Sequence, residues 1–479
     1  MPLATIHIYV DWNNDGDFSD PNECIDSYVM EISTERGRNN VLANSMVGTA
    51  ELLVNNNDKR FSPQNTASPL YPNLVDGRKV KITATHIALY EVFNGYISSI
   101  RPHPDLRRKD CYIYATGTLG RLKTDVETYL FGNATEATIL AYIIDEVEKP
   151  GETIPRSFDG GLDTYAYAWW LDEEALDAAF DVVRSAVGLL YERADGYLIY
   201  ENRNHRTAHT VAWTCDNAMS GLELDYDTKC IINRATTLAT NREGDDDLWE
   251  VYSLPEIIYI DASETRRFVA VLTNPYTQLD TPIAYTDYEF NSQADGEGDD
   301  LTANLIITKE APLKAQTCNI KIINTVATAG YLIAFGLQGR LLVATEMSRH
   351  KDEDTTSIDA HGLYLDEYDG GFISSIDKAL TRSELIIDRY AEPTDHLTIT
   401  LKPGTSDKLT QMLAREISDK IHIEEDDSCI DASYYIEKIK HYITPGSHVV
   451  TWLCSEVPPL GLVLTDGIKL GDTASINYS

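Results

Sequence analysis

The sequence has no long apolar run and no leader-like start. None of its apolar stretches approaches the roughly 18 residues that a membrane-spanning helix needs, which predicts a chain without a membrane segment. The N-terminus, MPLATIHIYVD, lacks a basic start followed by an apolar core. We therefore expect no secretory signal and folding in a cytoplasm.

Cysteine is scarce, and the usual catalytic signatures are missing. The seven cysteines are scattered and never form a CxxC pair, which argues against a disulfide framework or a cysteine-based zinc site and predicts buried thiols. The sequence contains no HExxH, GxSxG, P-loop or GxGxxG motif. His205 and His209 are four residues apart, but no third metal ligand is evident, so we interpret them as surface histidines. These absences predict that the protein is not an enzyme.

Basic residues are outnumbered by acidic ones. Lys and Arg total 40 against 76 Asp and Glu, which gives a net charge of −36. Because affinity for nucleic acid comes from cations that neutralise phosphates, the composition predicts no specific nucleic-acid binding. An acidic surface could instead line a channel along which DNA slides without sticking, and solubility or a saline habitat explains the same charge equally well.

The clearest local pattern is a helix followed by a hairpin. Asp172 is a suitable N-cap, apolar residues then recur at three- and four-residue spacing, and Gly188 is placed to end the helix. Two strands rich in Leu, Ile and Tyr follow, joined by Asp195-Gly196 as a tight primed turn. A chain of 479 residues has room for about three or four domains, and the segments on both sides are mostly strand.

One motif resembles a metal-binding loop. The segment DWNNDGDFSD begins at Asp11 directly after a strand, and its oxygen-bearing side chains alternate around Gly16, as in loops that surround Ca²⁺ with hard oxygens. A strand rather than a helix precedes it, and its last acidic residue stands one position later than in an EF-hand. A hairpin tip that merely turns the chain is the alternative. The candidate Ca²⁺ ligands are Asp11, Asn13, Asp15, Asp17, Ser19 and Glu23.

Other segments complete the expected outline. Further helices are predicted from Asn133 or Thr135, at 374–390 and at 406–418. Short β runs between acidic or Gly-bearing turns fill 249–343 and indicate a β-sandwich. Its Trp and Tyr side chains would form a sugar-binding face if they were exposed.

The chain resembles the tail-tip hub proteins, also called baseplate hub or minor tail proteins, of long-tailed phages and prophages. The motifs that carry this resemblance are VDWNNDGDFSD, VGTAELLVNNNDKRFSPQNTASPLYPNL, GRKVKI and FNGYISSI near the start, ALDAAFDVVRSAVG with its ENR ending in the middle, and SYYIEKIKHYITPGSHVVTWLC near the end. The resemblance is loosest at 241–343 and over the final 20 residues.

The resemblance implies an α+β fold dominated by strands, with two barrel-like β domains, an intervening α+β domain and an inserted β-sandwich. The expected domains are 1–120, an N-terminal barrel-like domain, 121–240, the α+β domain, 241–343, the inserted sandwich, 344–393, a helical return to the α+β domain, and 394–479, a C-terminal barrel-like domain.

It also implies a structural virion protein at the tail tip, made in the host cytoplasm. In this family the two barrels of each subunit lie side by side, so that a homotrimer forms a pseudo-sixfold ring that continues the tail tube and lets DNA pass during ejection. The expected partners are the distal tail or tail tube protein, the tape measure protein, and tip fibre or receptor-binding proteins. The competing interpretation is a monomeric, calcium-dependent, carbohydrate-binding adhesin, and a cryptic hydrolase is the weakest alternative.

Overall fold

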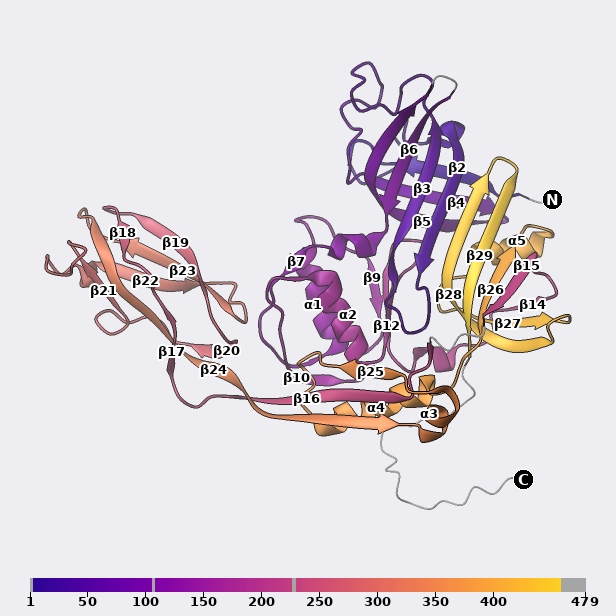
Figure 1. The fold of residues 1–479 in the computed structure, drawn as a ribbon. Helices are drawn as coiled ribbons and strands as arrows, with labels where there is room; N and C mark the ends of the chain where they lie inside the picture. The colour runs from indigo at the N-terminus through magenta and orange to yellow at the C-terminus, as the bar shows by residue number, and fades with distance from the viewer. Residues whose placement is uncertain (1–2, 106–107, 226–229, 458–479) are drawn as a thin grey trace.

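The computed structural model describes residues 3–105, 108–225 and 230–457, and its fold is α+β with strands dominant, as predicted (Figure 1). No helix in these ranges is long and apolar enough to cross a membrane. The cysteines form no disulfide there; most are buried as predicted, but Cys24 and Cys429 are exposed.

The largest element is a twelve-stranded sheet made from both ends of the chain. Its order is β1-β4-β5-β6-β3-β2-β28-β29-β26-β15, and β27 pairs with β28 and with β14. The N-terminal half contains β1 (Thr5–Val10), β2 (Val29–Gly37), β3 (Met46–Asn55), β4 (Lys79–His86), β5 (Ala88–Pro104) and β6 (Lys109–Thr116). The C-terminal half contains β14 (Trp213–Asp216), β15 (Gly221–Asp225), β26 (His396–Leu401), β27 (Lys420–Glu425), β28 (Ile430–Thr444) and β29 (Ser447–Glu456), with helix α5 (Ser406–Ala414) beside it.

The two β halves are not separately closed barrels. They join edge to edge, because residues 32–37 of β2 pair antiparallel with residues 438–443 of β28. Each half still has its own apolar core, and the N-terminal core also includes Leu409 and Leu413 of α5. The sheet therefore places two similar β units side by side within one chain (Figure 1).

The last residue of β2, Gly37, is where the two halves come closest. Its φ is +110°, and a Cβ atom there would lie 2.2 Å from the backbone oxygen of Glu437 in β28. The next residue, Arg38, donates its backbone N–H to that same oxygen over 2.9 Å. The junction therefore requires a residue without a side chain at position 37.

A buried carboxylate connects three parts of the molecule. The Glu437 side chain on β28 is fully buried, and its oxygens accept from Arg38 Nε at 2.7 Å, Arg206 Nη1 at 2.6 Å and Ser455 Oγ at 2.6 Å. Arg38 belongs to the N-terminal half, and Arg206 belongs to the α+β part. Burial alone would raise the pKa of Glu437, but the charges of Arg206 and Arg38 outweigh it and hold the pKa well below its ordinary range.

The α+β part lies against the sheet and contains helices α1 (Glu136–Val147) and α2 (Ala175–Ser185), which pack against each other in one core. Thr135 caps α1 as predicted, with its hydroxyl accepting from Thr138 N. A 3₁₀ helix, η2 (Thr118–Leu122), leads in from the N-terminal half, and η3 (His205–Ala208) leads out toward β14. The strands here are β7 (Asp125–Val126), β8 (Phe131–Thr135), β9 (Arg156–Phe158), β10 (Thr164–Ala168), β11 (Glu173–Glu174), β12 (Leu189–Glu192) and β13 (Leu198–Glu201).

Three local details of this part differ from the prediction. The N-cap of α2 is Glu174, because Asp172 has a φ of +50° and precedes the short strand β11. The left-handed residue after α2 is Val187, with a φ of +55°, and not Gly188, whose missing side chain admits the ring of Tyr200. The β12–β13 turn is not primed, because only Gly196 has positive φ and its N–H bonds to Arg193 O, as in a type I turn followed by a bulge.

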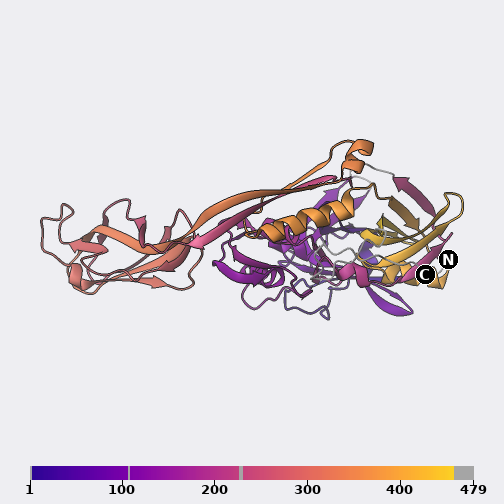
Figure 2. The ribbon, with the colours of Figure 1, turned by 90° about the horizontal axis from the view of Figure 1, so that it is seen from below.

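The block between β16 and β24 forms a separate two-sheet unit around its own apolar core. Figure 2 shows it at the far end of a narrow arm. Its strands are β17 (Trp249–Ser253), β18 (Ile258–Ile260), β19 (Thr265–Val271), β20 (Tyr276–Leu279), β21 (Tyr288–Asn291), β22 (Leu305–Glu310) and β23 (Thr317–Asn324), with η5 (Thr302–Asn304). We refer to this unit as the sandwich.

The arm consists of β16 (Arg234–Gly244) paired antiparallel with the 24-residue strand β24 (Gly330–Glu353), which continues into the sandwich. At the body, α4 (Ile376–Tyr390) packs on both strands. Helix α3 (Thr355–His361) and strand β25 (Leu365–Tyr368) complete this base. The helix predicted at 374–390 is thus confirmed, whereas the one predicted at 406–418 ends at Ala414, where Arg415 turns to extended backbone.

A loop of the sandwich also touches the body directly. Ala315 N donates to Thr128 O over 2.8 Å, and Trp169 Nε1 donates to Gln316 Oε1 over 2.9 Å. Lys314 Nζ lies 2.6 Å from Glu146 Oε2. These contacts and the arm together fix where the sandwich lies relative to the α+β part.

Candidate functional site

The Asp11 loop connects β1, an edge strand of the sheet, to the segment that pairs back with this strand. The chain leaves β1 at Asp11 and returns at Glu23, where Val10 N donates to Glu23 O over 2.9 Å and Ile25 N donates to Ile8 O over 2.9 Å. This pairing places the first and last acidic residues of the loop opposite each other at its base. Both are buried, with Asp11 0% and Glu23 1% exposed.

Hydrogen bonds from backbone N–H groups to carboxylates shape the loop. Asp11 Oδ1 and Oδ2 accept from the N–H groups of Asp15 and Gly16 at 3.1 and 3.0 Å, and Asp15 Oδ1 accepts from Asp17 N at 3.1 Å. Gly16 has a φ of +94°, which a side chain would oppose. The backbone therefore curls around the Asp11 carboxylate, as it does in calcium loops.

Three carboxylates converge inside this curl. One oxygen from each of Asp11, Asp15 and Glu23 lies within 4.8 Å of the other two. Glu23 Oε2 accepts from Asp20 N at 2.9 Å, but Glu23 Oε1 is buried without a hydrogen-bond partner. Burial, together with the charges of Asp11, Asp20 and Asp15, raises the pKa of Glu23. A cation coordinated by Glu23 Oε1 would give this oxygen a partner and would offset the repulsion among the carboxylates. The three carboxylates therefore fit a hard divalent ion.

The other three predicted ligands form hydrogen bonds within the loop. Asn13 Nδ2 donates to Asp15 Oδ2 at 2.9 Å and to Asp20 Oδ2 at 2.6 Å, which holds the loop closed. Asp17 Oδ1 accepts from both the N–H and the hydroxyl of Ser19, at 2.8 and 3.0 Å. The structure thus brings carboxylate oxygens of three of the six predicted residues together, and a ligand role for Asn13, Asp17 and Ser19 stays a prediction.

The aromatic residues of the sandwich divide into two groups. Tyr276 and Tyr288 belong to its core. Trp249, Tyr259 and Tyr285 are 51%, 45% and 60% exposed and lie on different strands or turns. Sugar binding by this unit stays a prediction.

The structure adds a ligand that the sequence analysis did not identify. Glu201, at the end of β13, lies beside His205 and His209, and ligand atoms of the three are mutually within 4.8 Å. Both histidines are partly buried; His205 begins η3 and His209 directly follows it. An acidic residue four positions before the first histidine was the available signal.

No protein-family model and no curated protein matches the sequence. The fold, however, is that of phage and prophage tail proteins, which confirms the predicted resemblance at the level of the fold. One solved structure with this fold is the 43 kDa tail protein of prophage MuSo2 from Shewanella oneidensis, with a TM-score of 0.52, 11% identity, and 94% of this chain and 98% of that chain covered. Another is the tail protein from Neisseria meningitidis MC58, with a TM-score of 0.53, 9% identity, and coverage of 95% and 97%.

Proposed function

We propose that the protein is a structural, non-enzymatic virion component, a tail-tip or baseplate hub. The observation that carries this proposal is the edge-to-edge pairing of two β halves in one chain. Three copies in a ring would present six such halves, which matches a threefold assembly to the sixfold symmetry of a tail tube. The likeness in fold to a prophage tail protein and to the tail protein from Neisseria meningitidis, over nearly the whole of each chain, supports the same conclusion.

Within the described ranges the sheet has three edge strands, β1, β14 and β15, and they differ in how open they are to pairing with another copy. The outer edge of β1 is covered by the returning segment at 23–25. Among the described residues, β15 pairs only with β26, which leaves its other edge open, and Leu224 on it is 44% exposed. We place the contact between copies at the β15 edge. The tail tube, tape measure and tip fibre proteins would bind the faces of the ring, and acidic side chains in its lumen would let DNA pass.

Particle mass and symmetry test this proposal. In single-particle images, with and without the tail tube protein, the chain is expected to form particles of three 53.6 kDa copies around an opening. Leu224→Asp should prevent the ring by placing a charge in the contact. Leu248→Asp, at a residue 49% exposed and distant from β15, is the matched control and should still assemble. A monodisperse monomer under both conditions would contradict the proposal and favour the adhesin alternative.

We further propose that the Asp11 loop binds Ca²⁺ through Asp11, Asp15 and Glu23. The ion would fasten the loop to β1 and offset the repulsion among the three carboxylates. At a Ca²⁺ concentration of about 100 times Kd, binding to the folded state alone stabilises it by about 2.7 kcal/mol.

Calcium titration followed by thermal unfolding checks this assignment. Ca²⁺ is expected to raise the melting temperature of the natural chain, and Asp11→Asn and Glu23→Gln should each abolish most of that rise. Glu256→Gln removes the same charge from an exposed residue of the sandwich and should leave it intact. Terbium luminescence gives a second measurement, because Trp12, buried in the loop, can sensitise an ion bound there. An equal Ca²⁺ response in all variants would refute the site.

A further inference from the structure

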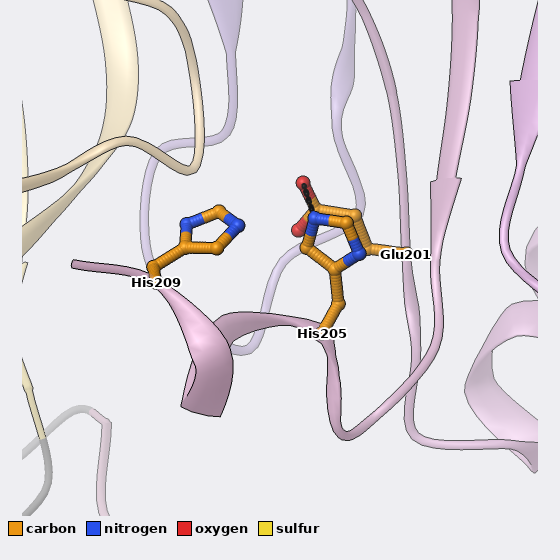
Figure 3. A group of neighbouring side chains, drawn as sticks. All are labelled: Glu201, His205 and His209. Atoms are coloured by element: carbon orange, nitrogen blue, oxygen red, sulfur yellow. Dashed lines mark ion pairs between the residues drawn. The ribbon is translucent and has the colours of Figure 1, made fainter.

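A second cluster of metal-ligating side chains lies where the α+β part meets the C-terminal β half. Glu201 ends β13, and His205 and His209 lie at the two ends of η3, which leads toward β14 (Figure 3). The imidazole rings are 4.8 Å apart between centroids, and His205 Nε2 is 3.6 Å from Glu201 Oε1. Two imidazoles and a carboxylate thus face one another.

Hydrogen bonds fix the tautomer of both histidines. His205 Nδ1 is 2.7 Å from Asp159 Oδ2, and His209 Nδ1 is 3.0 Å from the backbone oxygen of Ser418. A carboxylate and a carbonyl only accept, so both Nδ1 atoms carry the proton. Nε2 is therefore the nitrogen of each ring that is left to bind a metal ion.

The carboxylate is oriented in the same way. Glu201 is 2% exposed, its Oε1 accepts from Tyr191 OH at 2.9 Å, and its Oε2 accepts from Ser418 Oγ at 2.6 Å. Each of the three residues thus has an outer partner that holds its ligand atom, which is the arrangement found around protein-bound zinc. Arg206 Nε lies 3.7 Å from Oε2 of Glu201, and Arg206 also pairs with Glu437, a carboxylate that it shares with Arg38.

We propose that Glu201, His205 and His209 bind a divalent transition-metal ion of the zinc class. Two nitrogen donors and one oxygen suit Zn²⁺ and disfavour Ca²⁺, which takes oxygen ligands. Metal–ligand bonds of about 2.0 Å place tetrahedral ligand atoms roughly 3.3 Å apart, so small rotations of the half-buried histidines would complete the site. Water would occupy the fourth position. Because Ser418 O holds His209, the ion would fasten the α+β part to the C-terminal half.

The other histidine cluster lacks these features. In the group His422, Glu424 and Asp431, the Asp431 side chain is 82% exposed. His422 Nδ1 is 3.4 Å from Ser433 Oγ, a hydroxyl that can donate or accept and so leaves the tautomer open. Its variants therefore serve as a comparison.

Zinc titration of the chelator-treated full chain tests the proposal, in buffer with excess Ca²⁺ so that the Asp11 loop does not compete. Calorimetry should show one Zn²⁺ per chain, and Co²⁺ in its place should give the visible absorption of a tetrahedral site. His205→Gln and His209→Gln should each weaken binding at least about tenfold, and Asp159→Asn, which alters the outer partner of His205 and also the acceptor of Asn202 N, about tenfold.

Two controls isolate the cluster. His103→Gln alters an exposed histidine on β5, and His422→Gln alters the comparison cluster; both should bind Zn²⁺ as the natural chain does. If His209→Gln fails to fold by circular dichroism, His205→Gln decides the result alone, because the ring of His205 bonds to a side chain, the partly buried Asp159, rather than to backbone. The absence of saturable binding, or binding lost in His422→Gln and retained in His205→Gln, would overturn the proposal.

Discussion

Replacing Glu437 by alanine is expected to lower the free energy of unfolding by about 3 to 5 kcal/mol, because the change leaves Arg38 and Arg206 without the buried carboxylate that they share. Denaturant unfolding followed by the fluorescence of Trp452, fully buried in the C-terminal core, measures the loss. Asp427→Ala removes an exposed carboxylate from the same half and should stay within about 0.5 kcal/mol of the natural chain. A loss below about 1 kcal/mol for Glu437→Ala would show that the arginines find other partners.

The same variant should respond differently to acid. The pKa of Glu437 is held below its ordinary value of 4.5 in the folded protein, so the folded state binds the proton less readily than the unfolded chain. Its contribution to stability is therefore fully present above pH 4.5 and is lost as the pH falls toward the folded pKa. The natural chain should lose stability more steeply than Glu437→Ala over this acidic range.

Replacing Gly37 by alanine is expected to destabilise the junction of the two β halves by about 2 to 4 kcal/mol. The new Cβ would meet both an unfavourable φ of +110° and the backbone oxygen of Glu437 at 2.2 Å, so β2 and β28 must separate. Amide hydrogen exchange should report faster exchange along 32–37 and 438–443.

Gly446→Ala separates the two causes of that effect. Gly446 lies in the β28–β29 turn with a φ of +92°, but a Cβ there meets no atom within 4 Å. It should cost only about 1 kcal/mol, the conformational part alone. Equal losses for the two variants would mean that backbone strain, and not the close approach of the strands, dominates at Gly37.

Sequence patterns predicted those features that are defined by interactions between residues close in sequence. The cap at Thr135 depends on a hydroxyl three residues from the N–H it accepts, and the turn at Gly196 depends on one residue with positive φ, so both signals are in the sequence. The end of α2 was misplaced because Val187, and not the neighbouring glycine, adopts the left-handed conformation. The ring of Tyr200 packs against Gly188, and this tertiary contact decides which of the two residues adopts the left-handed conformation. Local sequence rules do not include such a contact.

Features that depend on pairing between distant strands could not be predicted. The convergence of Asp11 and Glu23 was anticipated because a calcium-like spacing lies within one loop. Glu201 precedes His205 by only four residues, a local signal that was overlooked, whereas the outer partners Asp159 and Ser418, which orient the group, are distant in sequence and could not be predicted. The joining of the two β halves likewise depends on residues about 400 positions apart, with Arg38 and Glu437 as the plainest case.

The arm has a mechanical consequence. Both strands join the body to the sandwich, so a pull on the sandwich along the arm is carried by the two covalent backbones in parallel, and the hydrogen bonds across the strands hold the pair together without bearing the load. Strand β24 runs from Gly330 in the sandwich to Glu353 at the base where α4 packs, and its register with β16 shifts once, between Asn241 and Arg242. A force applied to the sandwich would therefore reach the body along both strands of the arm and through the loop contacts at 314–316.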